Sequence, residues 1–195
     1  MNLPNKLSLF RLCLVPLIMI VLVLPDSVIP YFWSSIVGAV IFVIASLTDC
    51  LDGQIARKRN LITDFGKFID PLADKFMVLG ALLAIVYRSD ALRPFLFWAA
   101  VVVIFRELAV TSIRLLVSRK STVDMAAHMA GKIKTVAQIV CIVAALIEPL
   151  FYPAGTWMAL YPPVTLLTAA VMVITTVYSG ISYIIFYGKY LDPEK

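Results

Sequence analysis

The sequence predicts an all-α membrane protein with six transmembrane helices, in a single domain that covers residues 1–195. Hydrophobic residues make up 62% of the chain, and its mean hydropathy is +0.95. Charged residues make up 15%, whereas ordinary soluble proteins have about 25%. The apolar runs are about 18 to 24 residues long, which is enough to cross a hydrocarbon core of about 30 Å. This composition excludes a soluble enzyme.

The first apolar run, residues 1–24, is expected to be a retained membrane helix with a short interfacial segment at its start. We do not expect a signal peptide, because no small-x-small cleavage site follows and Pro25 leads into another apolar run. Asn5, Ser8 and Arg11 make its beginning polar. From these residues alone, a helix cap and a snorkelling arginine explain the polarity well.

The other five runs are separated by short polar or basic segments. Pro71 falls near the start of the third helix, where we expect it to occupy a well-tolerated position in the first turn. The five expected membrane spans cover residues of about 31–51, 70–87, 95–117, 129–150 and 164–187.

The distribution of Lys and Arg predicts the orientation in the membrane. Most of these residues lie at the N-terminus, in segments 52–69 and 114–134, and in the C-terminal tail. With six helices, all these segments fall on one side, and the positive-inside rule makes that side the cytoplasm, with both termini there. The net charge of +5 is modest, so we expect contact with membrane lipids and no nucleic acid.

The polar stretch 49–74 carries the strongest functional signal. Asp49 and Asp52 are spaced i, i+3, and Asp70 and Asp74 are spaced i, i+4, so each pair lies on one helix face. Four carboxylates at the edge of a membrane repel one another unless cations lie among them. Oxygen ligands without His or a Cys pair suit Mg²⁺ or Mn²⁺, and we expect two such ions here. The alternative is a set of acids that are solvated or paired with the neighbouring Lys and Arg residues.

Small and basic residues accompany the acids. Gly53 and Ala56 share the face of the first acid pair, and Gly66 lies one turn before Asp70. Missing side chains let a ligand approach the backbone closely. Arg57 adds a fixed positive charge that suits a phosphate. Two metal ions beside an arginine and a small-residue face indicate phosphoryl-transfer chemistry.

The order Asp-x2-Asp-Gly-x2-Ala-Arg-x8-Gly-x3-Asp-x3-Asp spans 26 of the 195 residues. It resembles the signature of the CDP-alcohol phosphatidyltransferases at every fixed position. The Arg-Glu-Leu stretch at Arg106 and the Gly-Lys-x-Lys-Thr stretch at Gly131 are similar to those of the bacterial phosphatidylglycerophosphate synthase branch of this family.

The resemblance implies an enzyme of phospholipid biosynthesis in the bacterial cell membrane. Such an enzyme transfers the phosphatidyl group from CDP-diacylglycerol to glycerol 3-phosphate and releases CMP at the cytoplasmic side. It also implies a homodimer, with Asp74 as general base in addition to its role as metal ligand. The opening Asn5-x2-Ser8-x2-Arg11 is also typical of these enzymes, and the resemblance implies that it lies close to the nucleotide and headgroup region. The residues expected near the nucleotide are Asn5, Thr48, Gly53, Ala56, Arg57 and Gly66.

A second polar cluster lies outside this motif. Glu107, Thr111 and Arg114 share one face of the fourth expected helix. One explanation is an Arg–Glu pair that holds helices together, with lysines that snorkel to lipid headgroups. The other is a cationic pocket for a phosphate on the acceptor, which needs several N–H donors. The residues expected in that pocket are Arg106, Arg114, Lys132 and Lys134.

Three other functions stay open from the sequence. The same chemistry can use inositol phosphate, serine or phosphatidylglycerol as the acceptor. An intramembrane prenyltransferase also uses Asp-rich motifs with Mg²⁺, but its two motifs are usually far apart in the chain. A transporter would carry its acidic residues near the bilayer midplane on broken helices, whereas these cluster at one edge.

Overall fold

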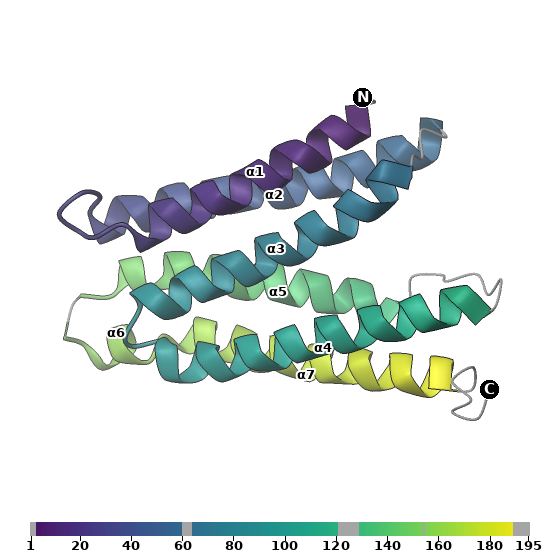
Figure 1. Cartoon of the computed structure of the whole chain (residues 1–195). Helices are drawn as coiled ribbons and strands as arrows, with labels where there is room; N and C mark the ends of the chain where they lie inside the picture. Colours follow the sequence, from purple (N-terminus) through teal and green to yellow (C-terminus); the bar gives the residue numbers. More distant parts are fainter. Residues whose placement is uncertain (1–2, 60–63, 121–128, 154, 189–195) are drawn as a thin grey trace.

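The computed structural model describes residues 3–59, 64–120, 129–153 and 155–188 (Figure 1). Every regular element in these ranges is helical, which confirms the predicted fold class. Side chains are described throughout these ranges except at residues 3–4, 50–59, 64–65, 67–68, 114–120, 130 and 188.

Six long helices make up most of the described chain, and two short elements join the last two. The short elements, which the sequence did not predict, are a 3₁₀ turn, η1 (Glu148–Phe151), and α6 (Trp157–Leu160). The long helices are α1 (Leu3–Val23), α2 (Tyr31–Arg59), α3 (Asp64–Arg88), α4 (Arg93–Lys120), α5 (Met129–Ile147) and α7 (Pro163–Gly188).

Five helices in the described chain are long and apolar enough to cross a membrane, namely α1, α2, α4, α5 and α7. The exception is α3, because Asp70, Asp74 and Lys75 interrupt its hydrophobic sequence. Its uninterrupted apolar part, residues 76–87, extends for about 18 Å at 1.5 Å per residue, which is short of a hydrocarbon core of about 30 Å. The prediction of six spans is therefore confirmed for five helices.

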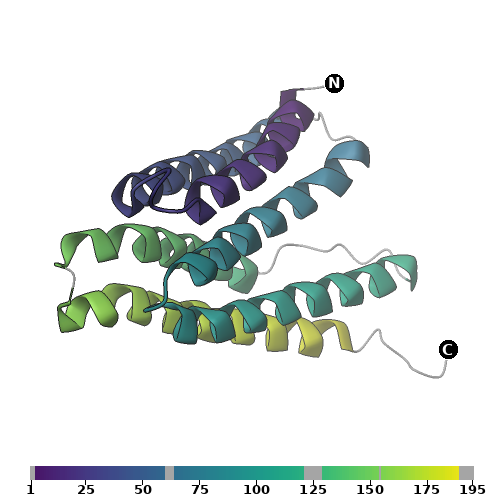
Figure 2. The same ribbon diagram turned by 60° about the vertical axis from the view of Figure 1, so that its left-hand side comes forward.

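The long helices form two groups with α3 between them (Figures 1 and 2). Helix α1 packs on α2 and α3, while α7 packs on α4 and α5. Contacts of α3 with α4 and α5, and of α2 with α5, join the two groups. Both termini lie at the end of the bundle where α2 ends and α3 begins. The basic end of α2, at Arg57, Lys58 and Arg59, therefore lies at this end of the bundle.

The predicted second span, residues 31–51, agrees with the apolar segment Tyr31–Asp49, and α2 continues past this segment as a helix to Arg59. The predicted start of the third helix is wrong. Helix α3 begins at Asp64, so Pro71 lies inside the helix and not in its first turn. An interior proline removes one backbone hydrogen bond. The start of α3 was predicted too late because its first turns are polar. A prediction from hydrophobicity alone detects only the apolar run that follows them.

The polar start of α1 is continuous with the rest of that helix and is packed against the protein. Asn5, Ser8 and Arg11 are all buried, and the Arg11 side chain is 0% exposed. The explanation of Arg11 as a snorkelling residue is therefore wrong. A fully buried guanidinium requires acidic or polar partners from neighbouring helices.

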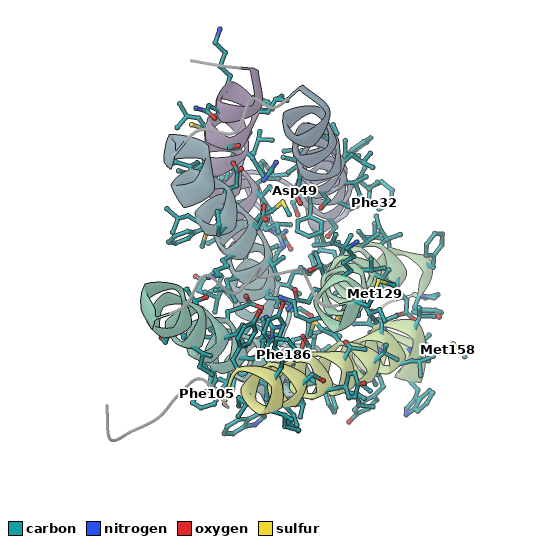
Figure 3. All side chains as sticks on the ribbon, turned by 90° about the vertical axis from the view of Figure 1, so that its right-hand side faces the viewer. Phe32, Asp49, Phe105, Met129, Met158 and Phe186 are labelled. Atoms are coloured by element: carbon teal, nitrogen blue, oxygen red, sulfur yellow. The ribbon has the colours of Figure 1, made fainter. Side chains whose placement is uncertain are left out.

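The apolar core fills the middle of the bundle, where each long helix contributes buried side chains. Many large apolar side chains point away from it, among them Phe105 on α4, which is 75% exposed (Figure 3). Outward apolar residues of this kind suit a lipid-facing surface.

Buried polar anchors fix the end of the bundle opposite the termini. Nη1 of Arg88 donates to the carbonyl oxygens of Leu22 and Leu24, at 2.8 and 2.7 Å. The Glu148 carboxylate accepts hydrogen bonds from the N–H of Val164 at 2.9 Å and of Thr165 at 2.5 Å. These contacts satisfy backbone groups that the ends of α1 and α7 leave without helical partners.

Replacing Glu148 by Gln tests the cap on α7. The substitution removes the negative charge and replaces one accepting oxygen by an NH₂ group, so we expect a loss of about 1.5–3 kcal/mol in the free energy of unfolding. Tm in detergent should fall by several degrees. Tyr152→Phe, which removes only a 3.3 Å contact with Glu148, is the matched control and should change Tm little. A wild-type Tm for Glu148→Gln would contradict the capping role.

Candidate active site

The acidic residues of α2 and α3 meet at one arginine of α1. Nη1 of Arg11 lies 2.8 Å from Oδ1 of Asp49 and 2.7 Å from Oδ1 of Asp74. The arginine side chain is fully buried, whereas the two aspartate side chains are 36% and 45% exposed. One guanidinium nitrogen thus bridges carboxylates from two helices and keeps them close despite their like charge.

A second contact fixes the register of α1 against α3. The Ser8 hydroxyl donates to Oδ1 of Asp70, one turn before the contact of Arg11 with Asp74. Residues three or four apart share a helix face, so the spacing of Ser8 and Arg11 matches that of Asp70 and Asp74. The two helices run in the same direction, which allows both contacts at once.

Figure 3 looks along the bundle from its right-hand end in Figure 1. Asp49 lies among side chains between α2 and the α1/α3 pair, and not on the outer surface. The carboxylates therefore face a shared interior region that solvent reaches in part.

A second charged cluster joins α4, α5 and α7. Oε1 of Glu107 contacts Nη1 of Arg106 at 3.2 Å and also accepts from Nζ of Lys134. Nη2 of Arg106 donates to the Ser179 hydroxyl at 2.5 Å, and its guanidinium lies 5.4 Å from the centroid of the Tyr183 ring. All three charged side chains are about nine-tenths buried. Two cations against one carboxylate leave this cluster with a net positive charge.

Comparison with known proteins identifies the family. A sequence model of the CDP-alcohol phosphatidyltransferase family matches residues 1–184, which include both charged clusters. The chain belongs to that family.

Similar bacterial proteins cover most of the chain. A CDP-diacylglycerol–glycerol-3-phosphate 3-phosphatidyltransferase of Bacillus subtilis is 42% identical over 191 residues, which is 93% of each chain. One of the same name from Salmonella choleraesuis is 34% identical over 86% of this chain and 88% of its own. A probable phosphatidylglycerophosphate synthase of Mycobacterium tuberculosis is 34% identical over 94% of this chain and 80% of its own.

CDP-alcohol phosphatidyltransferases use divalent metal ions, and the chemistry of the acidic residues fits such an ion. Asp49 and Asp74 already share one cationic nitrogen, and both stay partly open to solvent. Their donors are oxygens, which hard divalent ions prefer. Among the side chains that the structure describes, no three acidic, histidine or cysteine residues lie close enough together to hold a metal. Asp52 is also predicted from the sequence to be a metal ligand, but its side chain lies outside the described residues.

The predicted nucleotide residues are described only in part. Asn5 and Gly66 are buried near the start of α1 and of α3, in the half of the bundle that carries the acids. Thr48 is half-buried, and its hydroxyl donates to the carbonyl of Ala45 in its own helix at 2.8 Å. The surroundings of Gly53, Ala56 and Arg57 lie outside the described residues.

The predicted acceptor residues divide into two pairs. Arg106 and Lys134 converge on Glu107. The ion pair that connects two helices here is Lys134–Glu107, whereas Arg106 and Glu107 are neighbours on α4. Lys132 is exposed, and the Arg114 side chain lies outside the described part of the chain.

Sequence reasoning missed the contribution of α7 and the role of Arg11 in the acidic cluster. Ser179 and Tyr183 both contact Arg106, but serine and tyrosine inside a hydrophobic run resemble packing residues. The sequence feature that could have indicated this contact is the adjacent pair of small residues, Ser179 and Gly180. The absence of a side chain at Gly180 leaves room for Arg106, because a Cβ there would lie 3.2 Å from Arg106 Cγ.

A double-mutant cycle tests the Arg11–Asp49 bridge. Arg11→Met leaves the carboxylates without their shared cation, so Asp49→Asn should be less destabilising in that background than in the wild type. We expect a coupling free energy of about 1–2 kcal/mol, reduced by the partial exposure of Asp49. The exposed Arg93–Asp90 pair, 2.7 Å apart, is the control and should show a coupling near zero. Equal couplings for the two pairs would contradict the bridge.

Proposed function

We propose that this protein transfers the phosphatidyl group from CDP-diacylglycerol to glycerol 3-phosphate, giving phosphatidylglycerol phosphate and CMP. The observation that carries the proposal is the 42% identity over 93% of each chain with the Bacillus subtilis enzyme of that name. The unbroken acidic motif and the meeting of Asp49 and Asp74 at Arg11 support the same chemistry. The reaction is a step of phospholipid biosynthesis.

The acidic residues would hold two Mg²⁺ or Mn²⁺ ions, with oxygens from Asp49, Asp52, Asp70 and Asp74. When bound, the ions neutralise the pyrophosphate of the donor and the charge of the leaving CMP. Arg11 keeps Asp49 and Asp74 together, and Ser8 orients Asp70. The protein thus holds the carboxylates in place before the substrate arrives.

Asp74 is the proposed general base. Its contact with Arg11 holds the carboxylate in one orientation, beside α1. Asp74 takes the proton from a hydroxyl of glycerol 3-phosphate as that oxygen bonds to the phosphorus that carries diacylglycerol. The bond from this phosphorus to the CMP oxygen breaks, and CMP leaves. Asn5, Thr48, Gly53, Ala56, Arg57 and Gly66 would surround the nucleotide.

The cluster on Glu107 is the proposed site for the acceptor phosphate. Arg106 and Lys134 supply N–H donors in a largely buried place, where a charge-assisted hydrogen bond is strong. The net positive charge of the cluster favours a phosphorylated acceptor over serine. Lys132 and Arg114 would add positive charge at its edge.

In the membrane, all six long helices would cross the bilayer, with α3 shielded by its neighbours. The charged start of α3 and both termini would lie on the cytoplasmic side, where glycerol 3-phosphate is available. Figure 1 supports this arrangement, because the termini and the start of α3 share one end of the bundle. The protein would act as a homodimer in the bacterial cell membrane.

Release of CMP by the detergent-purified protein tests the activity. We expect release with glycerol 3-phosphate in Mg²⁺ or Mn²⁺, and none in EDTA or with inositol phosphate, serine or phosphatidylglycerol as acceptor. Release with another acceptor would agree with the proposed role of the aspartates but would overturn glycerol 3-phosphate as the acceptor. No release with any acceptor, from folded protein, would overturn the transferase function.

Asp74→Asn tests the general base. Loss of a base typically costs a factor of 10² to 10⁴, so kcat should fall at least about 100-fold. Binding of the nucleotide, measured by calorimetry, should persist in part. Asp90→Asn, which changes a largely exposed aspartate at the opposite end of α3, should keep wild-type turnover. Near-normal activity of Asp74→Asn would show that another group accepts the proton.

Lys134→Met and Lys132→Met form a matched pair for the acceptor site. Removing one charged hydrogen bond to a phosphate should raise KM for glycerol 3-phosphate about tenfold in Lys134→Met. The exposed Lys132 should have a smaller effect, and KM for CDP-diacylglycerol should change little in either variant. An equal rise of the acceptor KM in both variants would argue against a specific role for Lys134.

A further inference from the structure

A hydrogen bond joins α3, at the residue after Asp74, to α4, one turn after Glu107. Nζ of Lys75, the residue after Asp74, donates to the hydroxyl of Thr111 on α4. The same hydroxyl donates to the carbonyl oxygen of Glu107 at 2.6 Å. A threonine hydroxyl has one donor and two acceptor positions, so Thr111 serves both partners without conflict. That carbonyl belongs to the backbone of α4, whereas the Glu107 side-chain carboxylate contacts Arg106 and Lys134.

Two adjacent charged residues of α3, Asp74 and Lys75, face different helices. Consecutive residues of an α-helix point about 100° apart. Asp74 accordingly reaches Arg11 on α1, while Lys75 reaches Thr111 on α4. Because α3 lies between the two groups of helices (Figures 1 and 2), its rotation and register determine how the two clusters face each other.

Within the described side chains, apolar packing does little to define the register of α3 on α4 at this level. The last described residue that α4 contributes to the main apolar core is Val103, two turns before Thr111. Beyond it, Val110 packs with Tyr183 and Tyr187 of α7, in a separate small cluster. The contact of Lys75 with Thr111 is therefore well placed to hold α3 against α4 at the level of Asp74.

We propose that Lys75 and Thr111 are positioning residues that fix α3 on α4 and so set the separation between Asp74 and the cluster of Arg106, Glu107 and Lys134. The roles of these two clusters rest on the proposed function. An acceptor whose hydroxyl must reach Asp74 while its phosphate lies on Arg106 and Lys134 is sensitive to that separation. The Lys75–Thr111 contact thus selects a short phosphorylated alcohol of matching length.

Thr111→Val and Thr111→Ser provide a matched test by kinetics. Valine keeps the shape of threonine without the hydroxyl, whereas serine keeps the hydroxyl. We expect Thr111→Val to raise KM for glycerol 3-phosphate and to lower kcat, each about five- to tenfold, with KM for CDP-diacylglycerol within twofold of wild type. Thr111→Ser should behave as wild type, and Lys75→Met should reproduce Thr111→Val. The double variant should be no worse than either single variant, because both remove one contact.

A distance measurement tests the positioning without turnover. Spin labels on p-acetylphenylalanine at Phe76 of α3 and Phe105 of α4, which are 52% and 75% exposed, report the separation of the helices by pulsed electron paramagnetic resonance. Thr111→Val should shift or broaden the distance distribution, and Thr111→Ser should leave it unchanged.

The outcomes separate this proposal from the proposed function. An unchanged distance distribution in Thr111→Val overturns the positioning role. An equal rise of KM for glycerol 3-phosphate and for CDP-diacylglycerol also overturns it. A shifted distribution in Thr111→Val, in a protein whose wild type releases no CMP with glycerol 3-phosphate, supports the positioning role and overturns the proposed function instead.

Discussion

The bridge from Arg11 to Asp49 and Asp74 is the interaction on which the rest of this structure depends. A fully buried guanidinium without partners is costly by several kcal/mol, so α1 can pack here only if α2 and α3 supply carboxylates at its level. The carboxylates in turn need a cation between them. This mutual requirement fixes the relative positions of three helices, and the contact of Ser8 with Asp70 sets the register of α1 on α3.

The second charged cluster repeats this principle in the other half of the bundle. There the acid is central, and Glu107 holds one cation from its own helix and one from α5. Helix α3 contacts both halves, with Asp74 directed to one and Lys75 to the other. Under the proposed function, the donor nucleotide at the first cluster and the acceptor at the second would meet across this shared helix.

The sequence predicted the helical fold, the acidic motif and the family, because hydrophobic run length and Asp spacing depend on local periodicity. The resemblance placed Arg11 near the nucleotide and headgroup region, but its pairing with Asp74 was not predicted, because the two residues lie 63 positions apart and local patterns do not connect them. Ser179 and Tyr183 were missed because polar residues inside an apolar helix gain meaning only when a charged neighbour is placed beside them. The start of α3 was misplaced since its first turns carry no hydrophobic run.

The most direct test is the distance between the Arg11 guanidinium and the two carboxylates in the metal-free protein in lipid bilayers. Solid-state NMR dipolar recoupling between ¹⁵N in arginine and ¹³Cγ in aspartate measures it, with Asp49→Asn and Asp74→Asn to assign the signals. We predict that Arg11 couples to both Asp49 and Asp74 at ion-pair distance. Loss of coupling to both carboxylates, with Arg11 directed to the membrane surface, would contradict it.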